Sequence, residues 1–429
     1  MAAERPARYP AHAQDWFSVA ISIGHDRTVR LVLELDGSLD HSRLSEALRR
    51  VISEEPVLGC RFVVRPFRAY WRSREDLDSL ALCSLQRSDD VQRDLHAFMA
   101  EPIEPLRDPL VRLRIFRSAA DTLCIKISHA AVDGGGLKQF VFRLVSLYRA
   151  LGENPDLPPR PLVPGDRGQA QVLRLFRARA RLKALLTQPF HKKNWGFPFT
   201  GNDITGITFS TRFVALPVSA LRVAVKSRGA TIGEALVTSF AKALFEITDP
   251  PIGLPMPFII PVDLRRYLPD PGSAGMINLS SLGWITLVRK AGATFEETLA
   301  EVHRELEAMG RGNPGIGLAA IMEAGSRLGY AGFRMLSSAR ARAARRQGRE
   351  FPSLSNIGPL DPGTLGFGDV QLTGARFYAP VLYPPTFGLI AGSFADTLYY
   401  TASYAKGTVE GDIVERFLDR MVAEIESLG

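Results

Sequence analysis

A strand that runs straight into a glycine-rich turn and then a helix is the feature that most constrains this chain. Apolar residues alternate with other side chains over residues 121–128, which predicts a β-strand. The next eight residues, His129 to Gly136, end in three consecutive glycines, and we expect a loop there. Residues 137–151 repeat apolar side chains every three or four positions, which predicts a helix. His129 should therefore lie at the end of a strand, in a loop that opens a helix.

Both halves of the chain mix strands and helices, which predicts an α/β (α+β) fold. Because 429 residues exceed one ordinary core, we expect two domains side by side. The domains predicted from composition and pattern are 1–165 and 208–429, joined by a basic connecting segment at 166–207. Further elements follow from periodicity: strands at 28–35, 209–216, 258–262, 284–288, 387–394 and 398–404, helices at 42–53, 171–193, 232–245, 295–309 and from 412, and a loop at 353–362.

Composition limits the classes of partner. The net charge of +8 fits an anionic partner such as coenzyme A or an acidic carrier protein, and it equally fits an arginine-rich, solvated surface. Two basic runs, Arg174 to Lys193 and Arg340 to Arg349, have the same alternatives, with peripheral membrane contact as a third. No nucleic-acid-binding motif is present, so we expect no nucleic acid partner.

Targeting and redox signals favour a cytoplasmic protein. No apolar stretch approaches the ~20 residues of a transmembrane segment, and the first residues do not resemble a secretory signal. The three cysteines, an odd number without metal-ligand spacing, are expected to be buried thiols in a reducing compartment. We expect a monomer.

His129 is the strongest candidate for chemistry. Neutral imidazole can accept a proton near neutral pH, and a base needs a fixed ring tautomer. A tight glycine loop can fix it by placing a backbone carbonyl against one ring nitrogen. Asp133 is too close in sequence to be assumed a partner of the ring, but it can anchor the loop by pairing with a distant arginine. The alternatives are a purely structural loop histidine and a metal site; we expect no metal, because no further ligands cluster nearby.

Residues 125–140, with His129, Asp133 and Gly134, resemble the His-x-x-x-Asp-Gly active-site motif of the coenzyme-A-dependent acyltransferase superfamily. That superfamily includes chloramphenicol acetyltransferase, peptide-synthetase condensation domains, wax-ester synthases and polyketide-associated acyltransferases. Four more segments resemble the family's motifs in the same order: Pro56-Val57-Leu58, Thr231 to Ala241, Pro261 to Arg266 and Ser355 to Gly358. The resemblance implies two chloramphenicol-acetyltransferase-like domains side by side, with the active site in a tunnel between them.

The same resemblance implies a mechanism. His129 would deprotonate an acceptor hydroxyl or amine, which attacks the thioester carbonyl of acyl-CoA or of an acyl-carrier protein. Ser355 and Asn356 are candidates for the oxyanion and substrate loop, or they merely form a turn. Asp133 and Arg265 would form a structural salt bridge. No bound cofactor is implied; acyl-CoA or the acyl-carrier protein is a co-substrate.

One departure separates the alternatives. Condensation domains and wax-ester synthases carry a histidine before the catalytic one, and here that position is Ser128. This weakens the case for a peptide-bond-forming domain. We therefore expect an acyltransferase that moves an acyl group from acyl-CoA to a small-molecule or lipid alcohol. The alternatives are an enzyme with a carrier-protein donor and amine acceptor, and a non-catalytic binding module, against which the intact His129, Asp133 and Gly134 argue.

Overall fold

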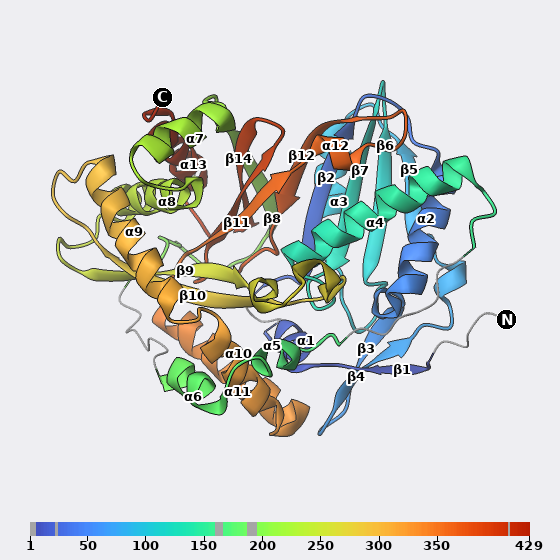
Figure 1. Ribbon diagram of the computed structural model, residues 1–429, viewed down its shortest axis with the longest axis horizontal. Coiled ribbons are helices and arrows are strands. Elements are labelled where there is room, and N and C mark those ends of the chain that lie inside the picture. The colour runs from blue at the N-terminus through green and yellow to red at the C-terminus, as the bar shows by residue number, and fades with distance from the viewer. Residues whose placement is uncertain (1–5, 22–24, 159–165, 187–194, 411) are drawn as a thin grey trace.

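The chain forms two mixed halves that lie side by side (Figure 1). The computed structural model describes residues 6–21, 25–158, 166–186, 195–410 and 412–429. The first half contains a five-stranded sheet of order β12-β2-β7-β6-β5, antiparallel except between β5 and β6. Its strands are β2 (Thr28–Leu35), β5 (Cys83–Arg87), β6 (Val111–Arg117), β7 (Asp121–Ser128) and β12 (Leu372–Tyr378). A small sheet of order β1-β4-β3 lies beside it, with β1 (Arg8–Pro10), β3 (Cys60–Val64) and β4 (Ala69–Ser73).

Helices cover both faces of the five-stranded sheet. Apolar side chains of α2 (His41–Glu54) and α4 (Gly134–Glu153) share one core with one face of the sheet, and α3 (Val91–Ala100) packs on the other face. The alternation in β2 predicts one polar face, but both faces of β2 are buried because α3 covers the second. Arg30, fully buried there, is satisfied by the carbonyls of Met99 and Thr28 and by Asp26.

The second half is built on a six-stranded sheet of order β10-β9-β11-β13-β14-β8. Its strands are β8 (Gly206–Phe213), β9 (Pro255–Asp263), β10 (Ser280–Val288), β11 (Ser353–Leu360), β13 (Gly388–Phe394) and β14 (Thr397–Lys406). The helices that share its core are α7 (Val218–Ser227), α8 (Ile232–Thr248), α9 (Phe295–Arg311) and α13 (Ile413–Glu426). Thr231 caps α8 in a capping box with Glu234, and the expected strands β13 and β14 pair antiparallel.

Strand β11 contradicts the loop expected at 353–362. It runs parallel to β13 along its whole length and meets β9 at its first residue. The turn-forming residues 355–358 are accommodated by a register shift between Asn356 and Gly358, where the strand bulges. Tertiary pairing therefore overrides the local turn preference.

A strand from late in the chain completes the sheet of the first half. After β11 and the short helix α12 (Pro362–Leu365), β12 pairs antiparallel with β2, and the chain then returns to the second sheet (Figure 1). The boundaries proposed at 165 and 207 do not describe this crossing, and they remain a prediction.

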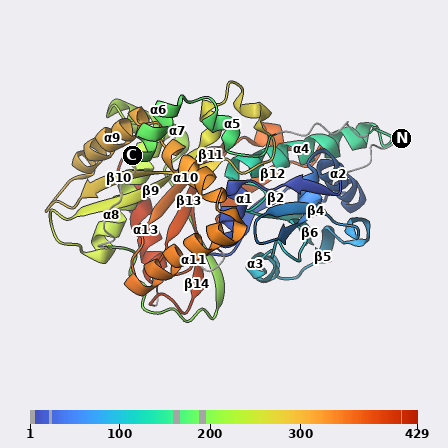
Figure 2. The same ribbon diagram turned by 90° about the horizontal axis from the view of Figure 1, so that it is seen from below.

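A layer of helices lies along the bottom of the molecule in Figure 1. The single basic helix expected at 171–193 is instead two short helices, α5 (Ala170–Leu173) and α6 (Ala178–Leu186), and Lys192 and Lys193 lie outside the described residues. Figure 2 shows α10 (Ile316–Ser326), α11 (Gly329–Gln347) and α1 (Ala13–Ala20) across the same side. Among the described residues, no helix is long and apolar enough to span a bilayer, and all three cysteines are buried and unpaired.

Candidate active site

His129 follows the last residue of β7 and is held by its backbone on two sides. Its N–H donates to the carbonyl of Arg27 at 2.5 Å, which continues the pairing of β7 with β2. Its carbonyl accepts from Asn278 Nδ2 at 2.8 Å. The imidazole is half-buried. The position and direction of the ring are therefore set by the end of the sheet and by one side chain of the second half.

The tautomer of His129 is set by its own turn. Nδ1 lies 2.8 Å from the carbonyl oxygen of Val132, and because a carbonyl only accepts, Nδ1 must carry the proton. Nε2 has no hydrogen-bond partner among the described residues, so its lone pair is available to take a proton. This is the arrangement in which a backbone carbonyl, and not a carboxylate, orients the base.

Asp133 does not contact the imidazole. Its carboxylate caps α4 through the N–H of Gly136, accepts from the N–H of Leu279, and receives Arg265 Nη1 at 2.8–2.9 Å. Both charged side chains are almost fully buried, and Arg265 Nη2 also donates to the carbonyl of Ile277. The structure thus brings Asp133 and Arg265 together across the two halves, and their role is to hold the turn.

The glycines form the first turn of α4, not the expected loop, because Asp133 caps the helix directly before Gly134. A Cβ on Gly134 would lie 2.6 Å from Ile357 of β11. One on Gly136 would lie 2.6 Å from the backbone oxygen of Ile277, which cannot move aside as a side chain can. The glycines therefore let the second half approach the start of α4, a stronger reason here than backbone flexibility.

Two residues that sequence reasoning missed hold the same turn. Arg167 donates to the carbonyl of Ala131 at 2.6 Å and pairs with Glu55 at 2.7 Å. Asn278 binds the His129 carbonyl, as described above, and accepts from Gln14. Each reaches the motif from more than 35 positions away, and no local pattern marks either one.

Ser355 and Asn356 lie on β11, on the second-half side of the site. The amide oxygen of Asn356 accepts from the N–H of Gly358 at 2.9 Å, so this side chain forms a turn of its own, and it is exposed. Ser355 is half-buried. Neither makes a hydrogen bond to His129 among the described residues. Lys138 of α4 ties this segment to the first half through the carbonyls of Ile357 and Pro359.

His25 is a second histidine beside the candidate base. It is buried just before β2, which pairs with the strand that ends beside His129. Its Nδ1 has no partner among the described residues. Burial, with a smaller contribution from the neighbouring His129, lowers the pKa of His25 to about 4. Burial likewise lowers the pKa of Lys138 to about 8. The sequence gives no signal for the proximity of His25, because it arises from the pairing of β2 with β7.

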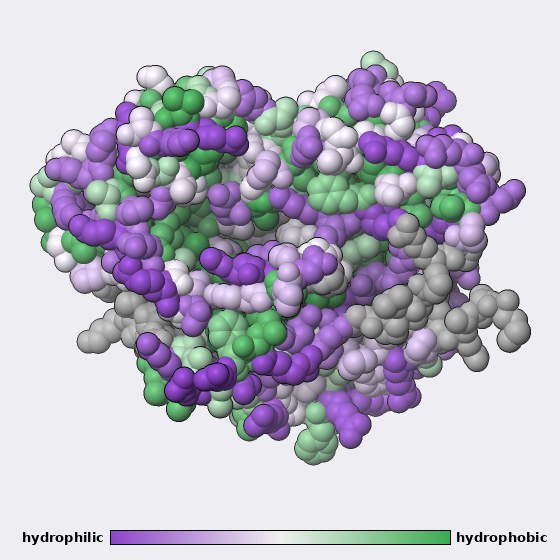
Figure 3. Space-filling model, viewed as in Figure 1, coloured by the Kyte–Doolittle hydropathy of each residue, from purple (hydrophilic) through white to green (hydrophobic). Residues whose placement is uncertain are grey.

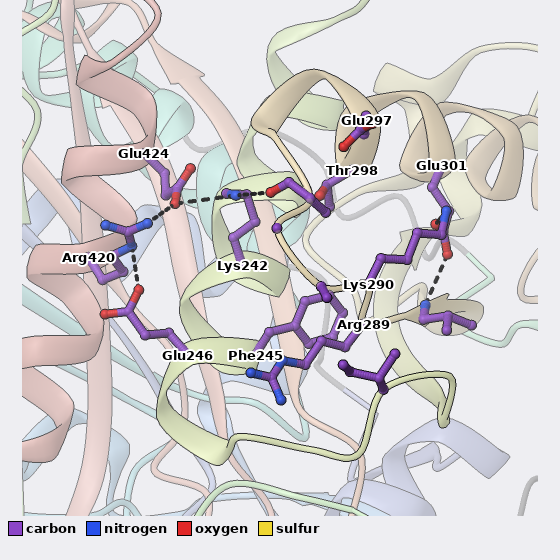
Figure 4. Close-up of a pocket in the computed structure, with 15 residues that line it drawn as sticks. Lys242, Phe245, Glu246, Arg289, Lys290, Glu297, Thr298, Glu301, Arg420 and Glu424 are labelled. Atoms are coloured by element: carbon purple, nitrogen blue, oxygen red, sulfur yellow. Dashed lines mark hydrogen bonds and ion pairs between the residues drawn. The ribbon is translucent and has the colours of Figure 1, made fainter.

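The surface is hollowed between the two halves (Figure 3). A separate pocket of about 410 Å³ lies in the second half, lined by α8, α13 and the start of α9 (Figure 4). None of the expected site residues lines it. Its charges neutralise one another: Arg420 pairs with Glu246, and Lys290 pairs with Glu301. We therefore place the candidate site at His129. The tunnel expected there remains a prediction.

Comparisons with known proteins identify the fold. No family model and no curated protein matches the sequence. Among solved structures, the first condensation domain of the calcium-dependent antibiotic synthetase is similar with a TM-score of 0.71 and 18% identity, covering 99% of this chain and 97% of that one.

Two further similar structures are those of proteins with other names. Polyketide synthase associated protein 5 from Mycobacterium tuberculosis has a TM-score of 0.66 at 15% identity, covering 99% of both chains. The trichothecene 15-O-acetyltransferase from Fusarium sporotrichioides has a TM-score of 0.70 at 13% identity, covering 97% of this chain and 94% of that one. The likeness to these structures confirms the expected resemblance at the level of fold. The chain has the chloramphenicol-acetyltransferase-like fold.

Proposed function

We propose that this chain is an acyltransferase that moves an acyl group from acyl-CoA to a hydroxyl acceptor, with His129 as general base. One observation carries the proposal: the Val132 carbonyl holds the proton on Nδ1 and leaves Nε2 without a partner among the described residues. A structural loop histidine has no need of a fixed tautomer with an unpaired nitrogen at a half-buried position.

The reaction follows from this geometry. Nε2 takes the proton of the acceptor hydroxyl as its oxygen attacks the thioester carbonyl, which gives a tetrahedral oxyanion. When the C–S bond breaks, the imidazolium returns that proton to the leaving thiolate, so an ester and a free thiol are formed. No covalent acyl-enzyme is required. Asp133 takes no part in proton transfer, because its oxygens are committed to Arg265, Gly136 and Leu279.

The oxyanion needs a donor, and the candidates differ in geometry. The side chain of Ile357 points to the start of α4, as its approach to Gly134 shows. Ser355 is half-buried on the same strand, and among the described residues its hydroxyl is not committed to another group. The amide oxygen of Asn356 closes its own turn. We therefore favour Ser355 over Asn356.

Named activities of similar structures support the reaction class. One is an O-acetyltransferase, and a variant of the starter condensation domain of rhizomide synthetase is described in complex with C8-CoA. The same fold also occurs in an epimerization domain of tyrocidine synthetase, so the fold alone does not decide the reaction. A carrier-protein donor with an amine acceptor, and a non-catalytic binding module, are the competing functions.

The test is release of free thiol from a panel of acyl-CoAs with mixed alcohol and amine acceptors. We expect acceptor-dependent release that falls by about 10² or more in His129→Ala. The matched control His41→Ala removes a histidine elsewhere and should retain activity. Activity that is indifferent to His129 would refute the mechanism. If no acyl-CoA supports turnover while acylated carrier protein does, the donor assignment is wrong.

A further inference from the structure

Helix α11 and the β3–β4 turn lie on the lower side of the molecule (Figures 1 and 2). Both expose apolar and basic side chains. We call this surface the lower face, and it comprises Arg65, Phe67, Arg68, Leu328, Arg334, Met335, Leu336, Arg340 and Arg342. All nine are exposed. Neither the acyltransferase mechanism nor the candidate site uses any of them.

The most prominent member is Phe67. It lies in the turn between β3 and β4, flanked by Arg65 and Arg68, and 82% of its side chain surface is exposed. The turn is joined to α11, because Ala331 N–H donates to the carbonyl of Pro66 at 2.9 Å. The turn and the helix therefore form one continuous surface.

The helix contributes more apolar area and a dense positive charge. Leu328, Met335 and Leu336 are 59%, 64% and 53% exposed. The segment 324–349 contains seven arginines and no acidic residue. Arg334 and Arg340 have no acidic partner among the described residues. Exposed apolar side chains in isolation need no explanation, but several on one helix and the turn joined to it, together with arginines such as Arg334 and Arg340, mark a binding surface.

The shape and charge of the lower face fit a lipid bilayer better than a protein. A protruding phenylalanine would need a matching pocket on a protein partner, and charged residues are depleted from the centres of protein interfaces. A bilayer needs no matching pocket: apolar side chains enter the boundary of the acyl chains while arginines remain at the headgroups. Anionic headgroups then complement the exposed arginines of the lower face.

We propose that the lower face binds the surface of a bilayer that contains anionic lipids. Phe67, Leu328, Met335 and Leu336 enter the interface, and the arginines contact the phosphates. The binding is peripheral and reversible. It goes beyond the proposed acyl transfer and does not require His129.

The test is flotation of the full chain with vesicles of phosphatidylcholine, with or without phosphatidylglycerol. We expect binding only to the vesicles that contain phosphatidylglycerol, and weaker binding as salt is raised. Phe67→Ser should weaken binding about tenfold, because it removes one aromatic side chain that would enter the bilayer interface. The triple variant Arg334→Gln, Arg340→Gln, Arg342→Gln should weaken it on the order of 100-fold.

Helix α7 provides the matched control, because it lies on the upper side in Figure 1 and also exposes an apolar and two basic residues. Arg222→Gln, Val223→Ser and Lys226→Gln together should leave binding unchanged. Thermal unfolding of each variant shows whether it remains folded. The proposal is wrong if the wild-type chain floats equally with neutral and anionic vesicles, or if it floats with neither. It is also wrong if lower-face variants that remain folded bind as tightly as wild type.

Discussion

The two sides of the candidate site are held in different ways. On the first side, the turn from His129 to Asp133 has its backbone and carboxylate bound by Arg265, Asn278 and Arg167. On the second side, the β11 bulge around Asn356 is tied to the first half mainly by Lys138. A general base needs a fixed ring, whereas a segment that accommodates substrate benefits from fewer constraints. The contrast agrees with the proposed roles: the backbone that carries the proposed base is fixed on the first side, and the segment on the second side is less constrained.

Removing Arg265 should have the largest effect on stability. Arg265→Ala leaves the buried carboxylate of Asp133 without its cation, which should lower the free energy of unfolding by roughly 3–5 kcal/mol. Urea unfolding measures this. The control Arg212→Ala removes a half-exposed partner of Asp419 and should cost no more than about 1 kcal/mol. Equal losses in the two variants would show that the first side is not specially anchored.

The buried His25 should make the first side sensitive to acid. Its folded pKa of about 4 lies below the unfolded value of 6.5, so between these values only the unfolded chain binds the proton. The contribution of neutral His25 to the free energy of unfolding is complete above pH 6.5. It is lost as the pH falls toward 4, and the total loss is roughly 3 kcal/mol. The groups that influence it are His129, Asp26 and Arg27.

His25→Gln should remove this part of the acid sensitivity, whereas the control His41→Gln should not. Unfolding free energies measured above pH 6.5 and near pH 4 test the difference. If His25→Gln and wild type lose the same stability over this range, His25 is charged in the folded chain as well. Its burial is then not a cause of the acid sensitivity.

The second side should show the smallest effects. Asn356→Ala should reduce kcat by less than about threefold, because its amide oxygen serves only the local turn. Ser355→Ala should reduce kcat by about tenfold or more if its hydroxyl stabilises the oxyanion. Steady-state kinetics of both variants, with His129→Ala as reference, order the three residues. A larger loss for Asn356→Ala than for Ser355→Ala would reverse the assignment.

Periodic elements were predictable from the sequence, and elements that depend on distant partners were not. Strands β2 and β7 begin and end at the expected residues, because alternation over eight positions is a strong signal. Helix α4 begins earlier than expected, because Asp133 caps it and the second half packs against its glycines. Strand β11 was missed, because Ser-Asn-Ile-Gly-Pro favours a turn unless β13 is beside it.

The residues of the candidate site also divide into those that the sequence predicts and those that depend on distant partners. His129, Asp133 and Arg265 could be named from motifs, because their residue types and spacing carry the resemblance. Arg167 and Asn278 could not, since each binds the turn through a backbone carbonyl that any residue supplies. His25 could not be named either, because its proximity to His129 depends on the register of β2 against β7.

The crossing of β12 into the first sheet affects how such a chain can be recombined. A chain cut between the halves would leave β2 at the edge of its sheet with one side unpaired, and such an edge is prone to pair with other molecules. Exchange of a whole half with that of another protein of this fold would also mismatch β12 with a foreign β2. Each half therefore depends on the other for a complete sheet or a matched strand, although each has a core of its own.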